Sequence, residues 1–209
     1  MIKLITNSTA LGEDFDSDLY ELGYINEAVA YCADQEVLGV DTETEGFDFT
    51  CKKMIMFQIG DEHNQYVIDT RHVSIEPLRQ ILESKKIIKI FHNAKFDYKF
   101  IKKWADIECE NVYDTFLVER VLSCGRHIGY GLKDLCKRYL NVELNKETRN
   151  QFIGLQGQAY RDDQIQYGAK DVEYLCKLRK LQLPKIAEFK LDNVVNLENR
   201  AVLAFSDIE

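Results

Sequence analysis

Proline and tryptophan are scarce in this sequence, and no stretch of it is low in complexity. The 209 residues include two prolines, Pro77 and Pro184, and one tryptophan. Hydrophobic residues make up 45% of the chain, which is enough to bury one sizeable core and leaves room for an appendage. Together these features argue against a chain that is disordered along its length.

The chain also lacks an excess of positive charge and any long apolar segment. Its formal net charge is −8 at pH 7, so the overall charge gives it no general affinity for nucleic acid. No apolar run approaches the roughly 20 residues of a membrane span, and the start turns polar too soon for a signal peptide. The six cysteines form no C-x-x-C pair, which argues against a zinc knuckle. We expect free thiols in the cytoplasm, or wherever DNA is replicated, and not a secreted or membrane protein.

Positive charge is concentrated in one lysine-rich stretch. Lysines occupy positions 85, 86, 89, 95, 99, 102 and 103, with Asp97 among them. Two interpretations are open: a basic patch that contacts nucleic acid, or the solvated face of a helix.

The order of the predicted elements indicates an α/β protein with a mixed central sheet. Apolar runs predict strands over residues 2–5, 37–40, 54–59, 65–68 and 87–91, and the middle three form an antiparallel meander. Helical spacing predicts helices over residues 27–34, 75–82, 96–104, 114–122, 132–140, 162–181 and 191–205. Asn26 is the expected cap of the first helix, and Asp162 or Asp163 that of the long one. The polar residues 141–160 predict a loop.

Three short segments place acidic residues on differently shaped elements. Asp41 and Glu43 end a predicted strand, and side chains two apart on a strand share a face, so these carboxylates lie about 7 Å apart along the backbone. Asp97 falls in the first turns of a helix, near the sheet end where α/β proteins tend to bind ligands. Tyr167 and Asp171 are four apart on the long helix and share a face.

Each acid also has an ordinary structural explanation. Asp41 or Glu43 alone suits a strand end, and Asp97 suits a helix N-terminus. Asp171 suits an ion pair with a lysine, and Tyr167 a half-buried packing position. Four converging carboxylates, however, repel one another unless cations are bound. Since Mg²⁺ and Mn²⁺ prefer oxygen ligands, the set predicts two divalent ions that cleave phosphodiester bonds.

The three segments resemble the signatures of the DEDD 3′–5′ exonucleases over about residues 20–185. They read Val-Asp-Thr-Glu-Thr-Glu-Gly, His-Asn-Ala-Lys-Phe-Asp and Tyr-Gly-Ala-Lys-Asp, and Asp114-Thr115 also fits. The third signature of this family carries His or Tyr; Gln166 occupies the His position, whereas Tyr167 stands four residues before Asp171. The chain is thus most similar to the tyrosine branch, which includes the proofreading domains of family A DNA polymerases and RNase D-like enzymes. The resemblance implies an RNase H-like fold.

The resemblance also implies a role for each acidic residue. Asp41, Glu43 and Asp171 would hold the first metal ion, and Asp41 and Asp97 the second. Tyr167 and Glu43 would orient the attacking water. The products would be a nucleoside 5′-monophosphate and a strand shortened by one residue.

The same resemblance indicates where the 3′ end of the strand would bind. The backbone around Thr42 and Thr44 would lie near the terminal sugar, and Asn93 would contact the strand. Phe47, six residues after Asp41, is a candidate stacking platform for terminal bases, and such stacking is worth about 1–3 kcal/mol per base. The alternative for Phe47 is a loop aromatic that packs on the core.

We expect residues 1–190 to form the exonuclease domain. Residues 191–209 resemble the helix that connects a proofreading domain to a family A polymerase domain, so such a domain, in cis or in trans, is the expected partner. The expected activity is metal-dependent removal of nucleoside 5′-monophosphates from the 3′ end of single-stranded or frayed DNA. One alternative is an RNase D-like RNA exonuclease. The other is a catalytically silent binding or scaffold domain, which the presence of all the acids and the tyrosine disfavours.

Overall fold

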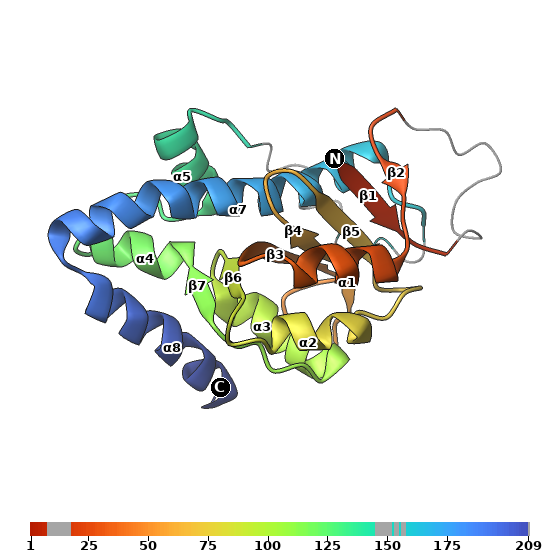
Figure 1. Ribbon diagram of the computed structural model, residues 1–209, viewed down its shortest axis with the longest axis horizontal. Helices are drawn as coiled ribbons and strands as arrows, with labels where there is room; N and C mark the ends of the chain where they lie inside the picture. Colours follow the sequence, from red (N-terminus) through yellow and green to blue (C-terminus); the bar gives the residue numbers. More distant parts are fainter. Residues whose placement is uncertain (8–17, 145–151, 153–154, 156–157, 209) are drawn as a thin grey trace.

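The computed structural model (Figure 1) describes residues 1–7, 18–144, 152, 155 and 158–208. The described strands form a seven-stranded sheet in the order β2-β1-β5-β4-β3-β6-β7. They are β1 (Ile2–Ile5), β2 (Glu21–Leu22), β3 (Val37–Thr44), β4 (Met54–Gly60), β5 (Gln65–Asp69), β6 (Ile88–Phe91) and β7 (Val112–Asp114). β3, β4 and β5 are antiparallel, whereas β6 runs parallel to β3. The predicted meander with an added parallel strand is confirmed.

Two strands are missing from the sequence prediction. β2 and β7 span two and three residues, which is too short for an alternating pattern to appear. Both are edge strands of the sheet. β7 matters for the site, because it pairs with β6 and ends at Asp114.

Helices cover both faces of the sheet (Figure 1). α1 (Ile25–Ala33), η2 (Glu76–Leu78), α2 (Arg79–Leu82) and α3 (Ala94–Ala105) pack on one face, and α7 (Asp162–Phe189) crosses the other. Among the described residues, no helix combines the length and apolar character needed to cross a bilayer. This mixed sheet between helices confirms the predicted fold class.

Alternation along β3 decides which side chains face α7. Val40 is fully buried in the core on the α1 and α3 side. Gly39, Asp41 and Glu43 therefore point to the opposite face, where α7 packs. A Cβ at position 39 would lie 2.6 Å from the backbone oxygen of Val172 on α7. Glycine at this position thus allows the helix to pass close to the strand that carries the two carboxylates.

The predicted caps of α1 and α7 are wrong by one or two residues. α1 begins at Ile25, and its N-cap residue Tyr24 makes no side-chain cap hydrogen bond, so Asn26 lies inside the first turn. The N-cap residue of α7 is Arg161, whose N–H donates to the side chain of Gln164 at 3.0 Å. Asp162 and Asp163 instead lie in the first turn of α7, where their charges suit the helix dipole.

α7 extends beyond its predicted end near residue 181. Pro184 lies inside the helix, which continues to Phe189. Proline usually interrupts a helix because it lacks an N–H. Here Ile186, just past the proline, is buried in a cluster with Ile90 and Tyr113 of the sheet, and this packing favours the helical conformation.

The remaining described elements are α4 (Thr115–Leu122), α5 (Leu132–Leu135), η3 (Cys136–Leu140), a π-type turn, and α8 (Asp192–Ile208). α8 packs against α3 and α4 and buries Val195 and Val202. The helix predicted over 191–205 is therefore confirmed, whereas its connection to a polymerase domain stays a prediction. Much of the predicted loop at 141–160 lies outside the described residues.

Candidate active site

Three carboxylates from two distant segments meet on the α7 face of β3. Asp41 and Glu43 end β3, Asp171 lies on α7, and one oxygen from each lies within 4.8 Å of the others. Glu43 and Asp171 are 6% and 3% exposed, and Asp41 is half-buried. Like charges this close favour a bound cation. An all-carboxylate donor set suits Mg²⁺ or Mn²⁺, so these residues fit the metal site that the sequence predicts.

Asp97 reaches the same cleft from the first turn of α3. It is buried, and its Oδ1 accepts a 2.6 Å hydrogen bond from Oγ1 of Thr42. Burial, and next the nearby charge of Asp41, hold the pKa of Asp97 well above its ordinary value. Asp97 is not part of the group whose oxygens lie within 4.8 Å of one another. It lies beside that group, as one wall of the shared cleft.

Asp114 holds the turn between β6 and α3 in place. Asn93, the N-cap residue of α3, has a left-handed backbone with φ of 67°. Its N–H and that of Ala94 donate to the two oxygens of Asp114, each at 2.9 Å. Asp114 also caps α4 by accepting from the N–H of Phe116 at 2.9 Å. Burial nevertheless raises the pKa of Asp114. One carboxylate thus fixes the starts of α3 and α4, two of the helices that border the cleft.

Tyr167 lies on α7 one turn before Asp171, and both line the cleft. The ring of Tyr167 packs against Phe152 with 6.2 Å between centroids. The helical spacing that the sequence predicts therefore brings a phenol and a carboxylate to the same opening.

The cleft has a volume of about 400 Å³. Besides the acids and Tyr167, its lining consists of Thr42, Phe47, His92, Asn93, Phe96, Phe116, Gly131 and Leu132. Of the four residues predicted to contact the strand, Thr42, Phe47 and Asn93 therefore line this cleft. Thr44 is not part of this lining; it is buried, and its hydroxyl donates to the backbone oxygen of Gly46 at 2.7 Å.

Five lining residues were not predicted as site residues from the sequence, namely His92, Phe96, Phe116, Gly131 and Leu132. Phe96 has the helical spacing of a core residue, and Phe116 follows the cap of α4. Their position next to the acidic signatures was the available signal. Gly131 and Leu132 follow a loop, and nothing in their local sequence marks them.

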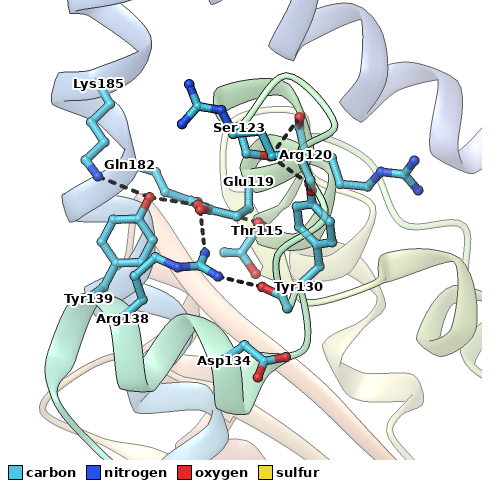
Figure 2. A network of polar contacts seen from close by, with 12 residues as sticks. Thr115, Glu119, Arg120, Ser123, Tyr130, Asp134, Arg138, Tyr139, Gln182 and Lys185 are labelled. Atoms are coloured by element: carbon cyan, nitrogen blue, oxygen red, sulfur yellow. Dashed lines mark hydrogen bonds and ion pairs between the residues drawn. The ribbon is translucent and has the colours of Figure 1, made fainter.

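A network of polar contacts around the buried Glu119 supports the wall that carries Gly131 and Leu132 (Figure 2). Glu119 of α4 accepts hydrogen bonds from Arg138 at 2.7 Å and from Tyr139 at 2.8 Å. Arg138 also donates to the backbone oxygen of Gly129 at 2.6 Å. The network therefore connects α4 with Gly129, before Gly131, and with Arg138 and Tyr139, after it.

A second groove adjoins the cleft and is rich in aromatic and cationic side chains. It has a volume of about 360 Å³ and is lined by Phe47, Asp48, Phe49, Asn93, Lys95, Phe96, Lys99 and Phe100. The ring of Phe47 is 72% exposed and meets Phe96 edge-on at 6.3 Å. The exposed ring of Phe47 therefore lies where the cleft and the second groove meet, and Phe47 is not a core residue.

The lysine-rich stretch is not one surface. Lys95 and Lys99 line the second groove, whereas Lys89 is fully buried and Lys102 pairs with Asp207 at 2.8 Å. The lysine-rich stretch is therefore neither one basic patch that contacts nucleic acid nor one solvated helix face.

Comparison with known proteins agrees with this geometry. A family model described as "3′-5′ exonuclease" matches residues 20–186, which include Asp41, Glu43, Asp97, Tyr167 and Asp171. The chain belongs to the 3′–5′ exonuclease family. This membership confirms the resemblance to the DEDD exonucleases and identifies the chain as a nuclease domain.

Curated relatives of this exonuclease domain include a DNA polymerase and a ribonuclease. DNA polymerase I of Aquifex aeolicus is 31% identical over 166 residues, covering 79% of this chain and 26% of that protein. Ribonuclease D of Haemophilus influenzae is 28% identical over 204 residues, covering 97% of this chain and 46% of that protein. The chain therefore spans less than half the length of these relatives.

Solved structures share the fold. NrnC of Brucella melitensis with bound Mg²⁺ superposes with a TM-score of 0.76 and 19% identity, covering 99% of this chain and 92% of NrnC. RNase D of Escherichia coli gives a TM-score of 0.78 and 18% identity, covering 97% of this chain and 50% of that one. These likenesses support the RNase H-like assignment.

Proposed function

We propose that this exonuclease removes nucleoside 5′-monophosphates from the 3′ end of single-stranded or frayed DNA with the help of two divalent ions. The observation that carries the proposal is the meeting of Asp41, Glu43 and Asp171 within 4.8 Å in a cleft that Asp97 and Tyr167 also line. No ordinary packing role explains three converging carboxylates of which two are buried.

In this proposal Asp41, Glu43 and Asp171 hold one ion, and Asp41 and Asp97 hold the other. The ions would be Mg²⁺ or Mn²⁺, as the oxygen ligands suggest. When bound, they supply Lewis acidity and neutralise charge on the phosphate. Structures of NrnC with Mg²⁺ and with pGG are compatible with this assignment.

The protein side chains have three tasks. Glu43 and the phenol of Tyr167 orient the attacking water at the opening of the cleft. Asn93 contacts the strand near the scissile phosphate. Phe47 and Phe96 stack on bases, which is worth about 1–3 kcal/mol per base.

The hydroxyls of the predicted sugar-side residues give no donor that would select RNA, which is compatible with a site that accepts DNA. The hydroxyls of Thr42 and Thr44 donate within the protein, to Asp97 and to the backbone oxygen of Gly46. Neither is left to donate to a ribose 2′-hydroxyl, the group by which proteins distinguish RNA from DNA. The relationship to a polymerase I also supports DNA, and a family A polymerase domain is the proposed partner.

An RNA exonuclease is the second candidate. It is favoured by the match to ribonuclease D, which covers 97% of this chain, whereas the polymerase match covers 79%.

Matched single-stranded DNA and RNA oligonucleotides, labelled at the 5′ end, test the substrate directly. We expect the DNA to be shortened from its 3′ end at least as fast as the RNA. Digestion of RNA alone would reject the DNA proposal in favour of the RNase D-like one. Asp171→Asn serves as the control, since it removes one ligand and should abolish cleavage of both strands.

A further inference from the structure

Gln58 lies in the centre of β4, directly across the strand pair from Asp41. Facing residues of an antiparallel pair point to the same side of the sheet, with Cβ atoms about 5 Å apart. The Gln58 side chain therefore points toward α7, as Asp41 does, and it is 0% exposed.

α7 passes directly over this side chain. A Cβ on Gly168 would lie 2.5 Å from Nε2 of Gln58 and 3.1 Å from its Cδ. Gly168 follows Tyr167 and precedes Asp171 by three residues, so it lies on the same helical turn. The Gln58 side chain thus lies beside Asp41 and beneath the helical turn that carries Asp171.

The amide of Gln58 is buried without satisfying its hydrogen-bonding groups. Within the part of the chain that the structure describes, neither Nε2 nor Oε1 has a hydrogen-bond partner. Such groups are rare, because a buried unpaired amide destabilises the folded state. A methionine or leucine would fill similar space without that cost.

Gln182 of α7 provides a comparison, because it is a second buried glutamine. It is also fully buried, but its Oε1 accepts from the hydroxyl of Tyr113 at 3.2 Å and its Nε2 donates to the backbone oxygen of Thr115 at 3.0 Å. Gln182 therefore has a structural role that its contacts explain, whereas the contacts of Gln58 explain none.

We propose that Gln58 is a positioning residue of the metal site, an inference that rests on the proposed function. Its Nε2–H donates to the carboxylates of Asp41 and Asp171 when a cation draws them together, and so fixes their orientation. Groups that orient metal ligands typically change metal affinity by roughly 10–100-fold when they are removed.

The test compares Gln58→Met with Gln182→Met by thermal unfolding, first with EDTA and then over a range of Mn²⁺ concentrations. A bound ion stabilises the folded state by an amount that grows with the logarithm of its concentration relative to Kd, so the concentration needed for a given increase in melting temperature reports the affinity. For Gln58→Met we expect a melting temperature in EDTA equal to or above that of the wild type. We also expect the Mn²⁺ concentration that produces the same increase in melting temperature to be about tenfold higher or more than for the wild type. For Gln182→Met we expect a lower melting temperature in EDTA and the same Mn²⁺ concentration as the wild type for that increase.

Two results separate failure of this inference from failure of the proposed function. If Mn²⁺ stabilises the wild type but not Asp171→Asn, while Gln58→Met reaches the same increase in melting temperature at the same Mn²⁺ concentration as the wild type, the role of Gln58 is overturned and the metal site stands. If Mn²⁺ does not stabilise the wild type, the metal site fails and this inference fails with it. Gln58→Leu, which also lacks the amide, provides the same comparison should the methionine variant not fold.

Discussion

The hydroxyl of Thr42 donates a 2.6 Å hydrogen bond to Oδ1 of Asp97, which joins β3 to α3 beside the acidic cluster. Thr42 stands between Asp41 and Glu43 in the sequence, and both partners of the bond are buried. The residue between two cluster carboxylates therefore orients the fourth acid of the cleft. The same strand presents carboxylates to α7 and a hydroxyl donor to α3.

Replacement of Thr42 by valine keeps the shape of the side chain and removes this donor. The Asp97 carboxylate, whose pKa burial already raises, then becomes harder to ionise. We expect Thr42→Val to need roughly tenfold more Mn²⁺ for half-maximal exonuclease rate, whereas Thr42→Ser should stay close to the wild type. Equal Mn²⁺ requirements for the valine variant and the wild type would show that the hydrogen bond has no such role.

Phe47→Ala tests whether Phe47, which lies between the cleft and the second groove, stacks on the bases of the substrate. Because Phe47 is 72% exposed, we expect stability to change by about 0.5 kcal/mol or less. The KM for a single-stranded oligonucleotide should rise about fivefold or more, in line with about 1–3 kcal/mol per stacked base. Tyr24→Ala is a matched control, since Tyr24 is 76% exposed and lies at the start of α1. Similar KM values for the two variants would argue against a stacking role.

Glu119→Ala tests the network that supports the Gly131 and Leu132 wall. Removal of Glu119 leaves Arg138 and Tyr139 without their shared acceptor, which should lower the free energy of unfolding by about 1–3 kcal/mol in urea titrations. The KM for substrate should rise as well, because the wall is released from α4. Glu143→Ala breaks the exposed pair with Lys137 and should leave both quantities nearly unchanged. An equally mild effect at Glu119 would contradict the account of the wall.

Lys89 should make stability depend on pH in the alkaline range. It is fully buried, its ammonium donates to the backbone oxygen of Ile87 at 2.9 Å, and burial lowers its pKa to about 8. In the unfolded chain the pKa of lysine is about 10.4. Between these two pKa values the unfolded state binds more protons than the folded state. The free energy of unfolding therefore rises with pH over this range as far as Lys89 contributes to it. Below pH 8 burial of the charged lysine destabilises the folded state to its full extent.

The measurement compares urea unfolding of the wild type and Lys89→Met at pH 7.5 and near pH 10. Other groups titrate in both proteins, so the difference between them isolates Lys89. We expect the free energy of unfolding of the variant, relative to the wild type, to be highest at pH 7.5 and to fall toward pH 10. A difference that does not change with pH would mean that Lys89 titrates normally.

Sequence reasoning predicts the acidic cluster well because local geometry fixes most of it. Asp41 and Glu43 share a face through the period of a strand, and Tyr167 and Asp171 through the period of a helix. What local spacing does not determine is the distance between β3 and α7. That distance depends on Gly39, whose lack of a Cβ lets the two elements approach.

Other features escape prediction because they depend on contacts between distant segments. Asp114 ends a strand of only three residues, yet it holds the starts of two helices. Lys89 belongs to a basic run but is buried, because strand pairing places it in the interior. Gln58 looks like one polar residue in an apolar strand, and its position under Gly168 becomes visible only once α7 is packed.

The central claim is that carboxylates from β3 and α7 together hold divalent ions that cleave the 3′ terminal bond. Single-nucleotide resolution of a 5′-labelled single-stranded oligonucleotide, digested by the wild type and by Asp171→Asn with Mg²⁺ or with EDTA, tests it most directly. The account predicts a ladder that shortens stepwise from the 3′ end only for the wild type with Mg²⁺. Equal digestion by Asp171→Asn, or digestion that persists in EDTA, would contradict it.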